Sequence, residues 1–219
     1  MDTYKTEEEQ VEALKKWLRE NGSSIVTGIL LALAVVFALK AWLAYRDRQA
    51  QAASNLFTQV VGSVQTGAPD KAQAAYDALI KDHGGSHYAF FGSLAMAHYW
   101  VDQGKKDTAR ALLQWALDHA DGPDEQALAH LRMARLLLDE GKLDQAADLL
   151  QAQVASPYGP LFAELEGDLA RAKGDPEAAR KAYDRVLAAA GGDASALRQF
   201  VQAKRDDLGI PDTAPGKAQ

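Results

Sequence analysis

The sequence contains no cysteine among its 219 residues. A chain without thiols forms no disulfide, no cysteine-ligated zinc site and no iron–sulfur cluster. This absence does not fix the compartment, because a helical protein with a sufficient apolar core needs no disulfide even outside the cytosol.

The sequence also lacks a concentrated cluster of lysine and arginine. Its 24 basic residues are outnumbered by 30 acidic residues, and the net charge is −6. Nucleic-acid binding requires a basic face, so we expect no nucleic-acid partner.

Motifs for catalysis or cofactor binding are missing as well. There is no glycine-rich phosphate-binding loop and no serine in a nucleophile elbow. His83 and His87 are four residues apart, but Gly84-Gly85 interrupts the helix that would place both imidazoles on one face. We predict no metal, no cofactor and no enzymatic activity.

One long hydrophobic run is present near the N-terminus. Residues 24–39 contain no charge, and the apolar character continues beyond Lys40 to Tyr45. As a helix, residues 24–45 would be about 33 Å long, which matches the hydrocarbon core of a bilayer. The Lys40 ammonium can reach the headgroups, where Trp42 also belongs. We predict a transmembrane helix over 24–45 rather than a buried soluble helix or a cleaved signal peptide, whose lead would be short and basic.

Residues 1–23 form a charged segment before this span. Thr6 and Glu9 have the spacing of a capping box, and Asn21-Gly22 predicts the end of a helix. The apolar side chains between them are Val11, Leu14, Trp17 and Leu18. We predict a cytoplasmic amphipathic segment; whether it docks on a membrane or partner, or is a solvated tail, stays open.

The charges that flank the span bear on its orientation. The basic residues before it are Lys5, Lys15, Lys16 and Arg19, and those after it are Lys40, Arg46 and Arg48. This small excess favours a cytoplasmic N-terminus without settling it. Within the span, Gly28 and Ala32 have the spacing at which another helix can approach closely, although an alanine-rich span contains such pairs readily by chance.

Four glycines mark a repeat in the remainder of the chain. They are Gly67, Gly104, Gly141 and Gly174, at spacings of 37, 37 and 33 residues. These spacings are typical of solenoids in which each unit is a helical hairpin. We expect each glycine to end the first helix of a hairpin in a left-handed cap, where a Cβ atom is unfavourable.

Three further columns support the repeat. Five residues after the glycines come Ala72, Ala109, Ala146 and Ala179. Nine residues after them come the large side chains of Tyr76, Leu113, Leu150 and Tyr183. Seven residues before them come Val60, Ala97, Ala134 and Gly167. We expect the small residues to let paired helices pack closely; Val60 departs from this pattern, so the first hairpin is the least regular.

These patterns predict an all-α protein. A single N-terminal transmembrane helix is followed by a tetratricopeptide-repeat-like α-solenoid of about four hairpins plus a C-terminal capping helix. The predicted hairpins are 52–66 with 69–82, 87–103 with 106–120, 124–140 with 143–154, and 160–173 with 176–190, and the capping helix is 193–207. The repeat domain spans 46–208, and the tail 209–219 is expected to be disordered. Because no helix breaker separates the span from the first repeat, we expect one continuous helix there.

Several stretches of the sequence resemble the YfgM family, the ancillary subunits of the bacterial SecYEG translocon. They are Gln10-Val11-Glu12-Ala13-Leu14-Lys15, Glu20-Asn21-Gly22, Leu131-Arg132-Met133-Ala134-Arg135, Gly167, Lys173-Gly174-Asp175 and Ala179-Arg180. The resemblance implies a bacterial inner-membrane protein with a cytoplasmic N-terminus and a periplasmic repeat domain. It also implies three partners: the SecYEG translocon, a PpiD-like membrane-anchored periplasmic chaperone, and newly exported polypeptides. The family has no catalytic residues to carry over.

The binding surface is expected on the first helix of each hairpin, which lines the concave face of tetratricopeptide arrays. The candidate groove residues are Phe57, Val61, Val64, Phe91, Leu94, His98, Val101, Leu128, Leu131, Arg135, Leu138, Leu161, Asp168 and Arg171. An apolar groove with a few charges suits an extended or helical hydrophobic segment, although many of these side chains could instead pack against neighbouring helices.

Two other binding functions compete with assistance in protein export. A scaffold for envelope assembly or division would bind folded partners tightly and would have no affinity for unfolded chains. A receptor facing the cytosol would bind the carboxyl-terminal peptides of chaperones through Lys, Asn and Arg, whereas the groove expected here is mostly apolar.

Overall fold

The computed structural model describes residues 7–151, 158–189 and 195–209, and all regular secondary structure among them is helical. The predicted all-α class is confirmed. Contacts within the chain divide it into two units, residues 1–52 and residues 53–219, and each unit is described by itself.

The first unit is the N-terminal part of α1, a helix that runs from Glu7 to Gln65 without interruption. It contains an 18-residue window that is apolar enough to cross a membrane, and none of that window is buried inside the protein. The exposed apolar side chains include Leu30, Leu31 and Phe37. A helix that exposes apolar side chains over this length is more stable in the hydrocarbon core of a membrane than in water.

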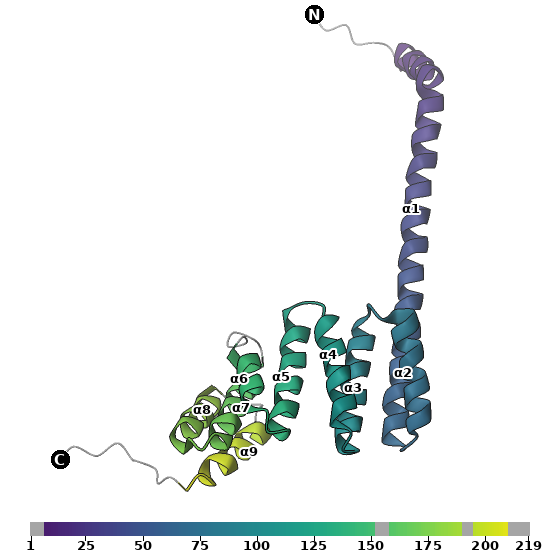
Figure 1. Cartoon of the computed structure of the whole chain (residues 1–219). Helices are drawn as coiled ribbons and strands as arrows, with labels where there is room; N and C mark the ends of the chain where they lie inside the picture. Colours follow the sequence, from purple (N-terminus) through teal and green to yellow (C-terminus); the bar gives the residue numbers. More distant parts are fainter. Residues whose placement is uncertain (1–6, 152–157, 190–194, 210–219) are drawn as a thin grey trace, which may run out of the picture. The chain divides into compact units, whose positions relative to one another are not determined.

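The predicted end of a helix at Asn21-Gly22 is wrong. Both residues are helical, and Asn21 Nδ2 donates a hydrogen bond to the Trp17 carbonyl oxygen, 3.0 Å away. A glycine inside a helix costs only about 1 kcal/mol relative to alanine, so the helix-forming residues on both sides prevail. Figure 1 shows the most N-terminal turns of α1, in purple, bent away from the axis of the turns that follow. Thr6, the predicted capping residue, lies outside the described residues.

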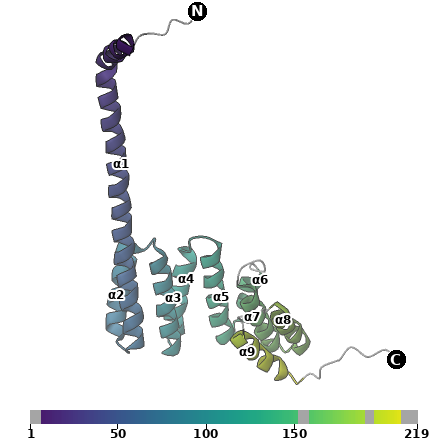
Figure 2. The same ribbon diagram turned by 180° about the vertical axis from the view of Figure 1, so that it is seen from behind.

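The second unit begins in the last turns of α1 and continues through eight further described helices. They are α2 (Pro69–His83), α3 (His87–Asp102), α4 (Lys106–Asp118), α5 (Pro123–Asp139), α6 (Leu143–Gln151), α7 (Gly159–Ala172), α8 (Pro176–Ala189) and α9 (Ser195–Asp206). Figures 1 and 2 show them following one another in chain order, and each packs on the next. The first helices of successive hairpins also touch, α3 with α5 and α5 with α7. The predicted helical hairpins are confirmed, and the predicted ends that fall on described residues differ from the observed ones by no more than two residues, apart from the start at 52, where α1 is continuous. The predicted ends at 154 and 190, the predicted start at 193 and the tail beyond 209 lie outside the described residues.

The four repeat glycines end the first helix of each hairpin as expected. Their φ angles are 68°, 73°, 73° and 78°, in the left-handed region that a Cβ atom disfavours. At Gly141, the glycine N–H donates to the Leu138 carbonyl oxygen at 3.0 Å, and the Lys142 N–H donates to the Leu137 carbonyl oxygen at 2.9 Å. The same pair of hydrogen bonds recurs at the other three glycines. This arrangement satisfies carbonyl groups that the end of the helix would leave unpaired.

The repeat columns form the core of the second unit. The four alanines that follow the glycines are completely buried. The four large side chains of the next column are buried as well, with at most 6% of any residue exposed. The earlier column is equally buried, from Val60 to Gly167. Its members pair with the large column: Ala97 shares a core cluster with Leu113, and Ala134 shares one with Leu150. The two helices of each hairpin therefore pack on one another through a repeated pairing of a small residue with a large one.

Candidate binding groove

Two hollows adjoin on the surface formed by the first helices of successive hairpins. The first, of about 290 Å³, is lined by Leu94, Ala97, His98, Val101, Leu113, Arg132, Arg135, Leu136 and Asp139 from α3, α4 and α5. The second, of about 610 Å³, is lined by Arg135, Leu138, Asp139, Leu161, Glu164, Leu165, Asp168, Leu197, Phe200 and Lys204 from α5, α7 and α9. Arg135 and Asp139 border both hollows, which together are called the groove below.

Part of the predicted binding surface lies in this groove. The residues that the structure places there are Leu94, His98, Val101, Arg135, Leu138, Leu161 and Asp168. They come from three successive hairpins, as expected for the first helices of a tetratricopeptide-like array.

The other predicted groove residues lie elsewhere. Leu131 is only 2% exposed and belongs to the core cluster of Ala134 and Leu150, so it cannot line a surface. Leu128 is half-buried against the same core, and Phe57 packs near Tyr88 with ring centroids 6.0 Å apart. Three more lie outside both hollows: Val61 and Val64, which are partly buried, and the exposed Phe91.

Arg171 is a special case because it is exposed but already paired. Its Nη2 atom lies 2.9 Å from Asp207 Oδ2. The helical period alone cannot decide which side of a first helix faces solvent and which faces the next hairpin. The prediction that Leu131 lines the groove is therefore wrong.

Sequence reasoning missed several groove residues. Leu197, Phe200 and Lys204 come from α9, which the sequence indicates only as a cap over the last core. In the structure α9 packs on α8, and its Val201 is buried in the cluster of Tyr183 and Val186. One face of α9 thus caps the core while another extends the groove. The spacing of Leu197, Phe200 and Lys204, three and four residues apart, was the available signal.

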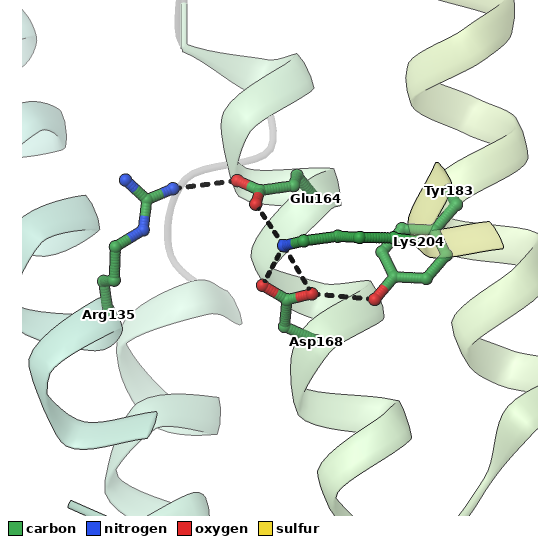
Figure 3. A network of polar contacts seen from close by, with 5 residues as sticks. All are labelled: Arg135, Glu164, Asp168, Tyr183 and Lys204. Atoms are coloured by element: carbon green, nitrogen blue, oxygen red, sulfur yellow. Dashed lines mark hydrogen bonds and ion pairs between the residues drawn. The ribbon is translucent and has the colours of Figure 1, made fainter. Parts of the chain in front are cut away.

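A network of charged side chains crosses the second hollow (Figure 3). Lys204 Nζ from α9 lies 2.6 Å from Glu164 Oε1 and 2.6 Å from Asp168 Oδ2, both on α7. Arg135 from α5 completes the network, with Nη2 2.8 Å from Glu164 Oε2. Glu164 is 2% exposed, and a buried carboxylate is tolerated because two cations neutralise it. The network joins three elements that line the groove.

Tyr183 supports this network from behind. Its hydroxyl donates a hydrogen bond of 2.7 Å to Asp168 Oδ1. The pKa of Tyr183 is raised far above its ordinary value, first by burial and second by the hydrogen bond to Asp168. The phenol therefore stays protonated and fixes the Asp168 carboxylate. Glu164 and Asp168 are thus paired with Arg135 and Lys204 within the second hollow.

The small pair predicted within the membrane span lies in the first unit. Gly28 and Ala32 are one turn apart on α1, and both are exposed. Nothing lies within 4 Å of the position that a Gly28 Cβ atom would occupy. Close packing of a second helix against this pair stays a prediction.

Comparison with known proteins places the chain in a family. The family model described as "Tetratricopeptide repeat-like domain" matches residues 15–210. The ancillary SecYEG translocon subunit of Escherichia coli (strain K12) is 28% identical over 213 residues, covering 96% of this chain and 100% of that protein. The protein of the same name from Haemophilus influenzae is 27% identical over 184 residues, covering 84% of this chain and 90% of that protein.

A solved structure of Pseudomonas aeruginosa pilF is similar in fold. It superposes with a TM-score of 0.60 and 15% identity, covering 73% of this chain and 68% of that chain. At this identity the likeness concerns the fold alone. The resemblance to the YfgM family that the sequence indicates is confirmed by the translocon subunits, and the chain belongs to the tetratricopeptide repeat-like domain family.

Proposed function

We propose that this chain is a membrane-anchored ancillary subunit of the SecYEG translocon and that its repeat domain assists protein export from the periplasmic side. The observation that carries the proposal is similarity over most of the chain, span and repeats together, to the proteins of this name from Escherichia coli and Haemophilus influenzae. The span would hold the chain beside the translocon. The N-terminus would be cytoplasmic and the repeat domain periplasmic.

In this proposal the groove binds the protein partners of the domain. Its apolar side chains, such as Leu94, Val101 and Leu161, suit hydrophobic segments that newly translocated polypeptides expose before they fold. A PpiD-like membrane-anchored chaperone would bind the same domain and receive these segments. No chemical step is required of the subunit, which acts by binding.

Site-specific photo-crosslinking in cells tests neighbours and topology together. One crosslinker replaces Trp42 in the predicted span, a second replaces Leu94 in the groove, and a third replaces Lys181, an exposed residue of α8 outside the groove. We expect Trp42 to crosslink to translocon subunits and Leu94 to a periplasmic chaperone or an exported chain. Lys181 serves as the matched control and should give neither product.

Protease added to the outer face of the inner membrane completes the test. We expect it to digest the repeat domain. A protected domain would place it in the cytosol and would support the receptor function instead. Crosslinks from Leu94 only to folded envelope proteins, with none to exported chains, would support the scaffold.

A further inference from the structure

Arg132 differs from the other cationic side chains of the groove in its ion pairing. Arg135 and Lys204 are both paired with carboxylates of α7, as Figure 3 shows. In the first hollow, Asp139 is engaged by Lys106, with Nζ 2.6 Å from Oδ2. Among the residues that the structure describes, Arg132 has no hydrogen-bonding or ion-pair partner, yet it lines this hollow. The first hollow therefore carries a positive charge that the rest of the groove does not neutralise.

The surroundings of Arg132 make this charge available to a ligand. Arg132 lies three residues before Arg135 and seven before Asp139, so the three share one face of α5. The pKa of the Arg132 guanidinium is lowered, first by partial burial and second by the positive charge of Arg135. A carboxylate placed beside Arg132 would relieve this repulsion, whereas a second cation would increase it. Guanidinium groups bind carboxylates with well-defined paired hydrogen bonds.

The apolar wall of the same hollow indicates a second property of the ligand, besides its negative charge. Leu94 and Val101 from α3 and Leu136 from α5 line it, together with the small Ala97 at its base. This wall suits one or two aliphatic or aromatic side chains. A ligand that fills the hollow must therefore combine apolar side chains with a negative charge next to them.

We infer that the first hollow binds peptide segments in which an aspartate or glutamate side chain adjoins hydrophobic residues, with Arg132 as the residue that selects the acidic side chain. This inference rests on the proposed function, because it names the class of segment that the groove takes. Purely hydrophobic segments would bind through the apolar wall alone and more weakly. Segments with lysine at the same place would be disfavoured by Arg132 and Arg135.

Peptide binding to the full chain in nanodiscs tests the inference. The probes are two fluorescent 12-residue leucine- and alanine-rich peptides with blocked ends, one with a central glutamate and one with glutamine in its place. Fluorescence anisotropy should give a dissociation constant about tenfold lower for the glutamate peptide, and the difference should shrink in high salt. In R132Q we expect both peptides to bind equally, close to the affinity of the glutamine peptide for the unaltered protein.

Two variants separate this effect from unfolding and from overall charge. R132K keeps the charge without the paired geometry and should retain part of the preference. K181Q removes one positive charge from α8, outside the groove, and should leave the preference unchanged. Circular dichroism melts establish that each variant is folded.

Three outcomes would overturn the inference. They are an undiminished glutamate preference in R132Q, equal binding of both peptides to the unaltered protein, and no binding of either peptide. Binding only of a version with a free C-terminal carboxylate would also contradict it, because the charge recognised would then be a chain end. The crosslinks of Trp42 to the translocon do not depend on these results, so the proposed function can stand where this inference fails.

Discussion

At the scale of single residues, Gly167 in α7 faces the ring of Tyr183 in α8 without room for a side chain. A Cβ atom on Gly167 would lie 2.2 Å from Cε1 of Tyr183. The Tyr183 ring cannot move aside easily, because it is fully buried and its hydroxyl is bonded to Asp168. We predict that G167A lowers the free energy of unfolding by about 2 kcal/mol, the usual cost of overpacking a core.

The neighbouring hairpins suggest how to rescue that variant. At the equivalent places the chain pairs Ala134 with Leu150, whereas Gly167 pairs with the larger Tyr183. Chemical denaturation should show that G167A/Y183L is more stable than G167A alone. G92A is the control, because the single close contact of its Cβ would be with the end of the Leu79 side chain, at 2.9 Å, and its contacts with Tyr76 and Phe57 would be ordinary ones of 3.7 and 4.0 Å. If G92A and G167A were equally destabilising, the contact with Tyr183 would not be the cause.

His87 gives the repeat domain a pH-dependent contact. Its Nδ1 lies 2.6 Å from Glu125 Oε1, and the other oxygen of Glu125 accepts the Asp121 N–H at 2.8 Å. The hydrogen bond to Glu125 is the main cause that raises the pKa of His87 above its ordinary value. The protonated form is thus favoured in the folded state. Its stabilising contribution is complete below the unfolded pKa and is lost as the pH rises through the folded pKa.

Comparison of H87Q with the unaltered protein measures this contribution. The free energy of unfolding should differ more at about pH 5.5 than at about pH 8.5, by less than about 1 kcal/mol because the imidazole is 66% exposed. E125Q should remove the same pH-dependent component. A difference between H87Q and the unaltered protein that grows with rising pH would contradict the assignment.

At the scale of helices, the repeat glycines and their flanking columns were sufficient to predict the hairpins. Gly104 and Gly141 follow the ends of α3 and α5 in the left-handed conformation, which glycine adopts more easily than other residues. The glycine itself is therefore a signal of the helix end that can be read from the sequence. Asn21-Gly22 carries the same local signal, yet α1 continues through it. The difference is that only two uncharged residues, Ser23 and Ser24, separate Gly22 from a long apolar run, and this run propagates the helix.

The groove was less predictable than the helices that line it. A helical period identifies the apolar side chains of α5 but not which of them the next hairpin covers, so Leu131 and Leu138 look alike in the sequence. Leu131 is buried, whereas Leu138 borders the second hollow. The role of Arg132 could not be predicted either, because whether it has a partner among the described residues depends on where the carboxylates of other hairpins lie. Burial and ion pairing are properties of the packed array, not of one helix.

At the scale of the whole repeat unit, the core is a series of clusters rather than one. Val60 and Tyr76 belong to a cluster at the first hairpin, and Tyr183 and Val201 belong to one at the last. Among the described residues, none of the core clusters contains side chains of both α2 and α8. Such an array is stabilised by interfaces between neighbouring hairpins. A local defect should therefore destabilise mainly its own hairpin and the hairpins next to it.

Alanine substitutions at the cap glycines test whether the effect of a local defect stays in the neighbouring hairpins. Gly67 and Gly174 have φ angles of 68° and 78°, so G67A and G174A should each cost about 1 kcal/mol in their own hairpin. Hydrogen exchange on the full chain should then show about fivefold faster exchange in α7, α8 and α9 for G174A, with α2 and α3 unchanged, because opening needs to break only the adjoining interface. G67A should give the converse pattern. An equal acceleration in every helix of the unit would mean that the hairpins open together, and that the contacts between first helices along the groove couple the two ends.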